Sequence, residues 1–201
     1  MSNCAVVSKA RLVLSSRAAS TFRQAAALLC VLASPLSAAA ADLFDGLAPE
    51  RAGAELTAVL EEAELACMRD PGVADVRRCR PLPGAMNALG EAALREVEAI
   101  FVDRQLAQVT AYFAESRFAA VRQVLSERLG AGQDWTIVIR AGMAGQFSDE
   151  IRIWETERFV LIAQQFDRKI DRGSIVYGTP EAMAELLQRV RSTPPGSMRD
   201  L

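Results

Sequence analysis

The absence of histidine limits the chemistry that this chain of 201 residues can perform. Serine–histidine–aspartate and cysteine–histidine arrangements both need an imidazole, which is also the commonest general base near neutral pH. Two carboxylates suffice for glycoside hydrolysis when they lie about 5–10 Å apart. The candidates, on expected strand connections, are Asp149, Glu150, Asp167 and Asp171. Neighbouring arginines favour solvated ion pairs, so we expect no catalytic residues, with a carboxylate-dependent hydrolase of cell-envelope sugar as the alternative.

We also expect no metal site and no cofactor. Cys67 and Cys79 have no histidine with which to complete a tetrahedral zinc site, and the acids lack the spacing of a calcium-binding loop. The glycine-rich run over 141–145 matches neither a phosphate loop nor a dinucleotide-binding turn. We interpret it as a flexible loop of a sheet.

The first 41 residues have the pattern of an export signal. Four basic residues and no acid precede Asp42, and an apolar run over 25–34 is followed by Pro35 and several alanines. This pattern predicts a signal peptide over 1–41, cut before Asp42, and a bacterial protein that is periplasmic or secreted. No later apolar run approaches the ~20 residues that span a bilayer, so no stable membrane insertion is expected after cleavage. An uncut signal would instead make the chain a membrane-tethered accessory subunit.

Two of the four cysteines remain after this cut, Cys67 and Cys79. Outside the cytoplasm such a pair is expected to form a disulfide, and closing so short a loop contributes roughly 3 kcal/mol on a chain-entropy basis. A lipid anchor is not expected, because Cys30 follows two leucines where a lipid-acceptor cysteine needs a small residue.

Charge and aromatic residues indicate the kind of partner. Four of the 23 basic residues and none of the 25 acids lie before Asp42, which leaves a formal charge of −6 on the remainder. Nucleic-acid binding is therefore not expected, because it needs a basic surface. Another envelope protein is the expected partner, with Phe147, Trp154 and Trp135 as candidate anchors. Trp154 stands between isoleucines on an expected strand, so the core is its alternative place. Nothing indicates an oligomeric state.

Hydrophobic periodicity predicts an α+β fold. We expect a single domain over 42–193, with an antiparallel β-sheet of about five to seven strands, two or three helices packed on one face, and a flexible C-terminal tail over 194–201. The expected elements are an amphipathic helix over 49–63, short strands around Cys67 and Cys79, a helix over 115–129, strands over 135–139, 151–155, 159–163 and 174–177, and a helix from Pro180.

Residues 94–113 are compatible with two structures. A helical stripe through Leu94, Val97 and Phe101 is broken by polar residues, whereas a hairpin that turns at Asp103 and Arg104 keeps the apolar residues of both strands on one face. β-branched and aromatic residues also favour the hairpin. With it, the chain reads as two helix-then-strands units in tandem.

Residues 94–178 resemble small exported bacterial proteins. The residues that carry the likeness are the hairpin, the stripe Phe118, Val121, Leu125 and Leu129 before Gly130, the strand with Trp154, and the aliphatic strand over 159–163. The layout is similar to the β-lactamase-inhibitor-protein and outer-membrane-assembly-lipoprotein type of fold. The resemblance implies helices on one face of an antiparallel sheet, and it assigns no binding residue to this chain.

Overall fold

The computed structural model describes residues 42–70, 73, 75–140 and 145–200. The predicted signal peptide over 1–41 and residues 141–144 of the predicted sheet loop lie outside these residues.

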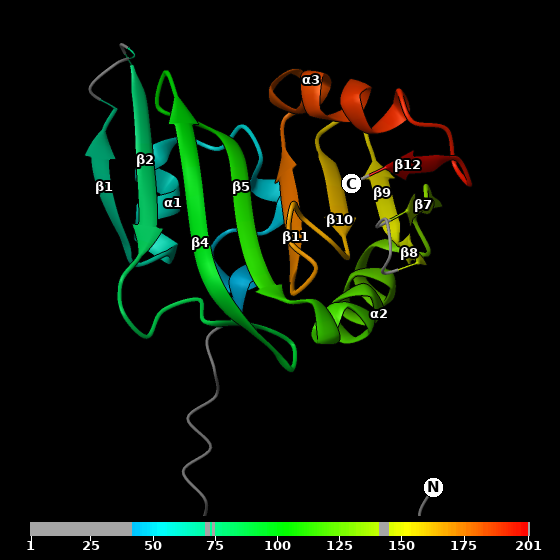
Figure 1. The fold of residues 1–201 in the computed structure, drawn as a ribbon. Helices are drawn as coiled ribbons and strands as arrows, with labels where there is room; N and C mark the ends of the chain where they lie inside the picture. Colours follow the sequence, from blue (N-terminus) through cyan, green and yellow to red (C-terminus); the bar gives the residue numbers. More distant parts are fainter. Residues whose placement is uncertain (1–41, 71–72, 74, 141–144, 201) are drawn as a thin grey trace, which may run out of the picture. The chain divides into compact units, whose positions relative to one another are not determined.

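Most strands belong to one antiparallel sheet (Figure 1). Its strands are β1 (Leu65–Arg69), β2 (Val76–Pro81), β3 (Ala88–Leu89), β4 (Ala92–Val102), β5 (Gln105–Ala114), β6 (Gln133–Asp134), β9 (Ile151–Glu155), β10 (Val160–Gln164) and β11 (Arg172–Gly178). Their order across the sheet is β1-β2-β4-β5-β11-β10-β9-β6, and β3 pairs with β4. A second sheet has three strands, β7 (Ile137–Arg140), β8 (Gln146–Asp149) and β12 (Met198–Asp200), in the order β12-β7-β8.

The α-helices are α1 (Leu56–Glu62), α2 (Phe118–Leu129) and α3 (Pro180–Arg191), and the 3-10 helices are η1 (Leu43–Asp45), η2 (Pro49–Arg51) and η3 (Glu115–Arg117). With an antiparallel sheet at the centre, they confirm the predicted α+β class. α3 begins as its sequence predicts, because the Thr179 side chain accepts a hydrogen bond from the backbone N–H of Ala182.

The hairpin is the structure that residues 94–113 adopt. Val97 and Phe101 of β4 are buried, as are the facing residues of β5. Asp103 and Arg104 have φ values of +49° and +67°. A two-residue hairpin loop needs such positive values at both positions, since its twist then matches that of the strands.

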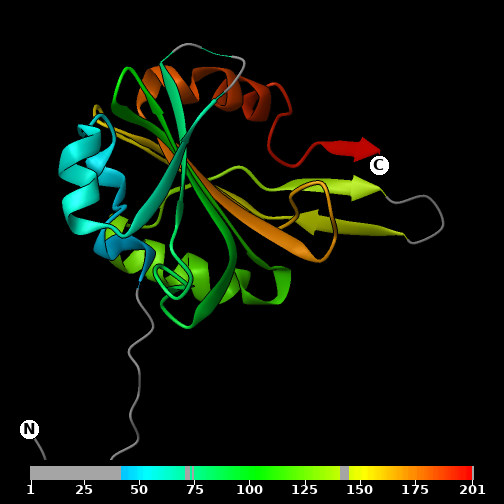
Figure 2. The same ribbon diagram turned by 90° about the vertical axis from the view of Figure 1, so that its left-hand side faces the viewer.

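Helices cover both faces of the sheet, which corrects the prediction that they pack on one face. Leu161 of β10 belongs to the core beneath α1 and α2, whereas its neighbour Ile162 belongs to a second core with Met183 and Leu187 of α3. Figure 2, seen from the β1 edge, shows the sheet between α2 and α3. The physical reason is the composition of β10, which is apolar on both sides and must be covered on both.

Two helix-then-strands units do follow one another along the chain. α1 precedes β1, β2, β4 and β5, and α2 precedes β6, β9, β10 and β11. Across the sheet the second set runs in the reverse order of the first, so the last strands of the two units, β5 and β11, are neighbours. This order agrees with the tandem arrangement expected from the sequence.

The strand after Trp135 and the C-terminal segment differ from the prediction. β7 leaves the main sheet and pairs antiparallel with β8 and parallel with β12. The flexible tail predicted over 194–201 differs from the structure up to Asp200. The segment is held by the pairing of β12 with β7 and by a hydrogen bond from the Gly196 N–H to the Thr136 carbonyl. A three-residue strand held by a distant partner has no periodic pattern of its own.

The helix expected over 49–63 is divided. Its first part is the short helix η2, and α1 begins only at Leu56. Between them the Gly53 N–H donates to the carbonyl of Leu106, and the Leu106 N–H donates to the carbonyl of Ala54. These bonds to β5 occupy backbone groups that a continuous helix would need.

Cys67 and Cys79 lie directly opposite each other on β1 and β2, with sulfurs 2.00 Å apart. The predicted disulfide is therefore present. It joins the edge strand of the sheet to its only neighbour among the described strands.

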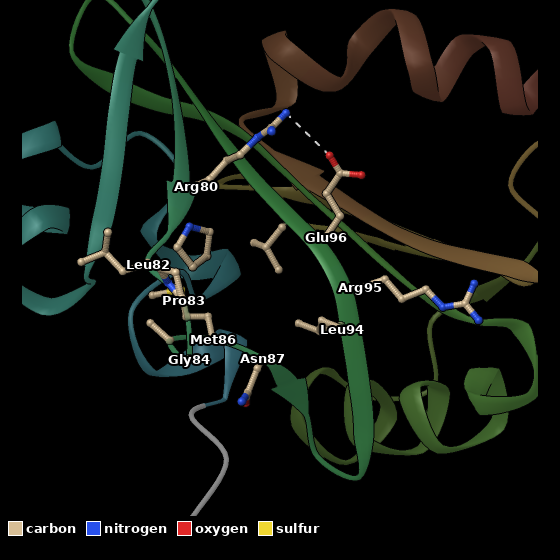
Figure 3. Close-up of a pocket in the computed structure, with 12 residues that line it drawn as sticks. Arg80, Leu82, Pro83, Gly84, Met86, Asn87, Leu94, Arg95 and Glu96 are labelled. Carbon is tan, nitrogen blue, oxygen red and sulfur yellow. Dashed lines mark ion pairs between the residues drawn. The ribbon is translucent and has the colours of Figure 1, made fainter.

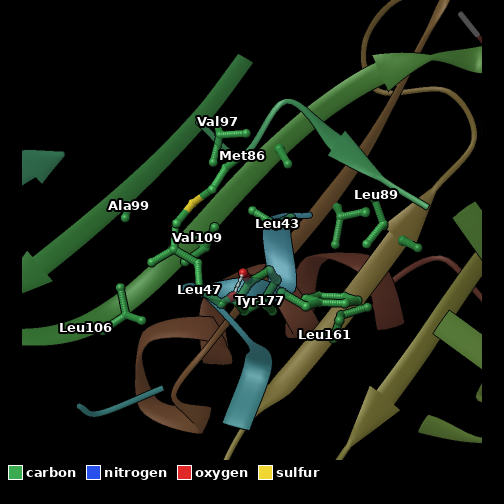
Figure 4. Packing of buried hydrophobic residues seen from close by; sticks show 14 of the residues in the cluster. Leu43, Leu47, Met86, Leu89, Val97, Ala99, Leu106, Val109, Leu161 and Tyr177 are labelled. Atoms are coloured by element: carbon green, nitrogen blue, oxygen red, sulfur yellow. Dashed lines mark hydrogen bonds between the residues drawn. The ribbon is translucent and has the colours of Figure 1, made fainter. Parts of the chain in front are cut away.

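Tyr177 connects β11 to the beginning of the domain. It is fully buried, and its hydroxyl donates a hydrogen bond to the carbonyl of Leu47. Figure 4 shows Tyr177 in the core beside Leu43, Leu47 and Leu161. Burial raises the pKa of Tyr177 well above its usual value. The hydroxyl therefore stays a neutral donor.

We expect Tyr177→Phe to lower the free energy of unfolding by about 1–3 kcal/mol, because the buried carbonyl of Leu47 loses its donor. Tyr112→Phe is the matched control, since Tyr112 is half-buried and its hydroxyl has no hydrogen-bond partner among the described residues. It should change stability by less than about 0.5 kcal/mol. Urea unfolding followed by circular dichroism measures both, and equal losses in the two variants would contradict the role of the Tyr177 bond.

Candidate functional site

One half of the main sheet has a face without a helix in the part of the chain that the structure describes. In Figure 1, α1 lies behind β1, β2 and β4, and nothing is drawn in front of them. α3 contacts β5, β10 and β11 on that side. Four of the uncovered side chains on β2 and β4 are charged, and they lie on the same side as the apolar Val76, Ile100 and Val102. We call the charged residues Arg78, Arg80, Glu96 and Glu98 the open face.

The charges of the open face pair across the two strands. Glu98 lies 3.0 Å from Arg78 and 3.3 Å from Arg80, and Glu96 lies 3.6 Å from Arg80. Both arginine side chains are about half exposed. Exposed ion pairs of this kind contribute about 0–1 kcal/mol to stability. These charges are therefore not required to hold the fold together, and they are accessible to a partner.

A hollow lined by both apolar and polar residues adjoins the open face (Figure 3). Its volume is about 290 Å³, and we call it the loop pocket. The loop after β2 and the first half of β4 line it, with Arg80 and Glu96 of the open face at its rim. Leu82 is 43 % exposed there, between Pro81 and Pro83. The prolines restrict the backbone of this loop, so the pocket is largely preformed.

The aromatic residues predicted as partner anchors do not form one surface. Trp154 is 4 % exposed in the core beneath α1 and α2, where its indole N–H donates to the carbonyl of Gly130 at 2.7 Å. Trp154 therefore lies in the core, which is the alternative to its predicted role as a partner anchor. Trp135 and Phe147 lie partly buried against the α3 core, and the rings of Phe147 and Phe166 are edge to face with their centroids 4.9 Å apart.

Of the four candidate acids, Asp149 and Asp167 line the same cavity of about 230 Å³, between α3 and the sheet. Asp149 is 1 % exposed and accepts hydrogen bonds from the Gln164 side chain at 2.7 Å and from the Phe166 N–H at 3.0 Å. These donors fix its orientation and fasten the chain at the end of β10. The hydrogen bonds of Asp149 thus give it a structural role.

The two other acids lie apart from this cavity. Glu150 accepts hydrogen bonds from Arg122 at 2.7 Å and from Arg152 at 2.9 Å. Asp171 is exposed and lies 3.9 Å from Arg95. Both therefore take part in ion pairs, Glu150 with its predicted neighbour Arg152 and Asp171 with the distant Arg95 instead of an adjacent arginine.

A second cavity of about 210 Å³ adjoins the first beneath α3. The two have five lining residues in common, Gln164, Asp167, Arg168, Leu186 and Val190. We call them together the α3 cavities. Tyr112 of β5 lies at the second one, and its pKa is raised, mainly by burial and further by the nearby Asp167 carboxylate. Its hydroxyl is a neutral donor across the physiological pH range.

The open face could have been found in the sequence. Arg78 and Arg80 are two residues apart on either side of Cys79, and Glu96 and Glu98 are two apart on either side of Val97. Such alternation indicates strands with one polar face. The pairing of the two strands, which brings the opposite charges together, has no local signal.

We expect tyrosinate absorbance at 295 nm to remain well below one tyrosine equivalent when the native protein is brought to pH 10. Both tyrosines, Tyr112 and Tyr177, have raised pKa values, so folding favours their neutral forms. The stabilisation that results from these raised pKa values is fully present below the pKa of about 10 that tyrosine has in the unfolded chain. It is lost as the pH rises through the pKa values of the folded protein. Unfolded chain in urea is the reference, and an absorbance equal to it at pH 10 would contradict the prediction.

Comparisons of the chain with protein-family models, with curated proteins and with solved structures give no match. The resemblance to the inhibitor-protein and assembly-lipoprotein type of fold stays a prediction. Among the residues that the structure describes, no helix is long and apolar enough to cross a membrane.

Proposed function

We propose that this chain is an exported, non-enzymatic protein of the bacterial periplasm that binds another envelope protein through the open face and the loop pocket. The observation that carries this proposal is an uncovered sheet face with four charged residues beside a hollow that has both apolar and charged residues in its lining.

The geometry has the two parts of a protein–protein interface. Binding energy concentrates in a few side chains that fill pockets, and a polar rim around them provides specificity. The loop pocket is of a size to receive one apolar side chain, with Leu82 and Leu94 in its wall. Arg80 and Glu96 at the rim offer one charge of each sign to a partner.

The Cys67–Cys79 disulfide supports export, because such bonds form and persist in oxidising compartments. The first described residues support a cut before Asp42. The backbone nitrogen of Asp42 lies 3.0 Å from a carboxylate oxygen of Asp45. Cleavage there would turn this nitrogen into an α-ammonium group beside that carboxylate, and hydrogen bonds to charged groups are stronger than neutral ones.

The carboxylate-dependent hydrolase has one observation in its favour, since Asp149 and Asp167 line the same cavity. The two hydrogen bonds that Asp149 accepts give it a structural role instead. We therefore propose protein binding, and not hydrolysis, as the function of this chain.

Mass spectrometry of the protein recovered from the periplasm should find a chain that begins at Asp42. The small residues before this position and its own place at the start of η1 are the reasons. A chain that keeps residues 1–41 and fractionates with membranes would contradict export as a cleaved protein and support the tethered alternative.

Leu82→Asp should abolish capture of the envelope partner, because a carboxylate would enter the wall of the loop pocket. Leu60→Asp is the matched control, since Leu60 is 41 % exposed on α1, and Leu82 is 43 % exposed. Cross-linking in cells, followed by mass spectrometry of the captured proteins, compares both with the unchanged chain.

If the chain is exported, the captured partner is an envelope protein. The amount of partner captured should fall at least tenfold with Leu82→Asp and stay unchanged with Leu60→Asp. Thermal unfolding of the two variants verifies that both fold. A partner retained equally by both variants, or no specific partner of the unchanged chain, would overturn the proposed binding surface.

A further inference from the structure

We propose that the second of the α3 cavities, between α3 and strands β5 and β11, binds a sugar acid, that is, a ring with several hydroxyl groups and one carboxylate. This site is separate from the open face and the loop pocket. It does not depend on the protein-binding function proposed for them.

The first observation is a hydroxyl at the cavity wall without a hydrogen-bond partner among the described residues. Ser174 is 4 % exposed and lines this cavity, and its side chain has no hydrogen bond to any residue that the structure describes. Asp149 and Ser174 are the buried polar side chains of the described part of the chain, and both line the α3 cavities. The Ser174 hydroxyl oxygen is not among the fully enclosed side-chain atoms, so it can be reached from the cavity, and a ligand there can donate to it or accept from it.

The strand register sets further polar groups beside Ser174. Tyr112 lies directly opposite it on β5, and Gln164 lies opposite on β10. The Gln164 amide donates to Asp149 and to the carbonyl of Phe166, so its own oxygen stays available as an acceptor. These cavity groups include both donors and acceptors. A ligand with hydroxyl groups, each of which donates and accepts, suits them better than a ligand that only donates.

Two more polar groups continue the row along β5. The Gln108 amide donates to the Thr110 hydroxyl at 3.1 Å, and both residues line the cavity. This bond leaves the Thr110 hydroxyl hydrogen and the Gln108 oxygen for a ligand. Alternate residues of a strand are about 7 Å apart, so the row spans more than one hydroxyl of a sugar ring.

The charge of the cavity fits a single carboxylate. Arg168 lines it and has no ion pair with any described residue. The nearby Asp167 pairs with Arg172 at 3.8 Å, and the Arg172 guanidinium lies 4.4 Å above the Tyr112 ring. One uncompensated cation beside a carboxylate favours a singly charged anion over a phosphate with two charges.

The opposite wall is apolar and belongs to α3. Leu186 and Val190 are partly buried there, and Val176 and Ile162 continue the surface on the sheet. A sugar ring has a C–H face between its polar edges, so it can contact such a wall while its hydroxyls reach the strands. The backbone groups of β5, β11 and β10 pair with one another, which leaves no free strand edge here for a peptide.

The test is isothermal titration of the purified full chain with D-glucuronate, D-galacturonate, D-glucose and acetate. We expect at least one of the two sugar acids to bind, and glucose and acetate to bind at least about tenfold more weakly, because glucose lacks the carboxylate and acetate lacks the hydroxyls. No heat from either sugar acid up to about 10 mM, or equal binding of acetate, would overturn the proposal.

Variants locate the ligand. Ser174→Ala and Tyr112→Phe should each weaken sugar-acid binding about fivefold, and Arg168→Gln about tenfold or more. Leu82→Asp should leave binding unchanged, which separates this site from the protein-binding surface. Native amide NMR spectra verify that the variants fold. Binding that survives all three substitutions would overturn the assignment to this cavity.

A disaccharide that ends in glucuronate distinguishes a free sugar acid from a glycan end. The adjoining cavity shares five lining residues with this one, so a glycan end has room for its second ring. Tighter binding of the disaccharide supports a glycan source, and weaker binding supports a free sugar acid.

Discussion

The pairing of β5 with β11 is the constraint on which the rest of the molecule depends. It joins residues 108–114 to residues 172–178 and so connects the two helix-then-strands units into one sheet. The approach is close at the end of β11, where a Cβ on Gly178 would lie 2.1 Å from the carbonyl oxygen of Ala107. No side chain fits there without moving backbone. The glycine therefore permits the junction, and through it the alignment of Tyr112 with Ser174.

The two halves of the sheet differ in how many faces of their strands are apolar and must be covered. β10 is apolar toward both sides and is enclosed between two cores, one of them made with α3. β2 and β4 bury residues on one side and carry four charged residues on the other, where Ile100 and Val102 also lie, so a single layer of helices covers their buried side. The open face follows from this difference. The polar row of β5 lies at the boundary between the two halves, where the cover by α3 ends and a cavity forms.

The parts of the fold that the sequence predicts are those with strong local patterns. The hairpin turn at Asp103 and the capped start of α3 at Thr179 are examples, since each depends on neighbouring residues. The disulfide is predicted on other grounds, because Cys67 and Cys79 are the two cysteines outside the predicted signal peptide. The errors concern long-range contacts. The strand β12, the departure of β7 from the main sheet and the delayed start of α1 all depend on bonds to distant segments.

The candidate site was predicted least well, for the same reason. Trp154 stands out in the sequence, yet the structure uses its ring in the core. Ser174 is unremarkable in the sequence, and its importance comes from burial, from its register with Tyr112 and from the lack of a partner. None of these properties can be deduced from residue type or spacing alone.

The hydrogen bond between Tyr177 and Leu47 also bears on when the chain can fold. It joins residues 130 positions apart, and β5 must likewise wait for β11 before the sheet can close. Contacts so distant along the chain slow folding, because a large loop must be ordered before they form. The β4–β5 hairpin is local, but β5 keeps one edge unpaired and Leu47 lacks its donor until the segment of β11 is available, so the core closes last.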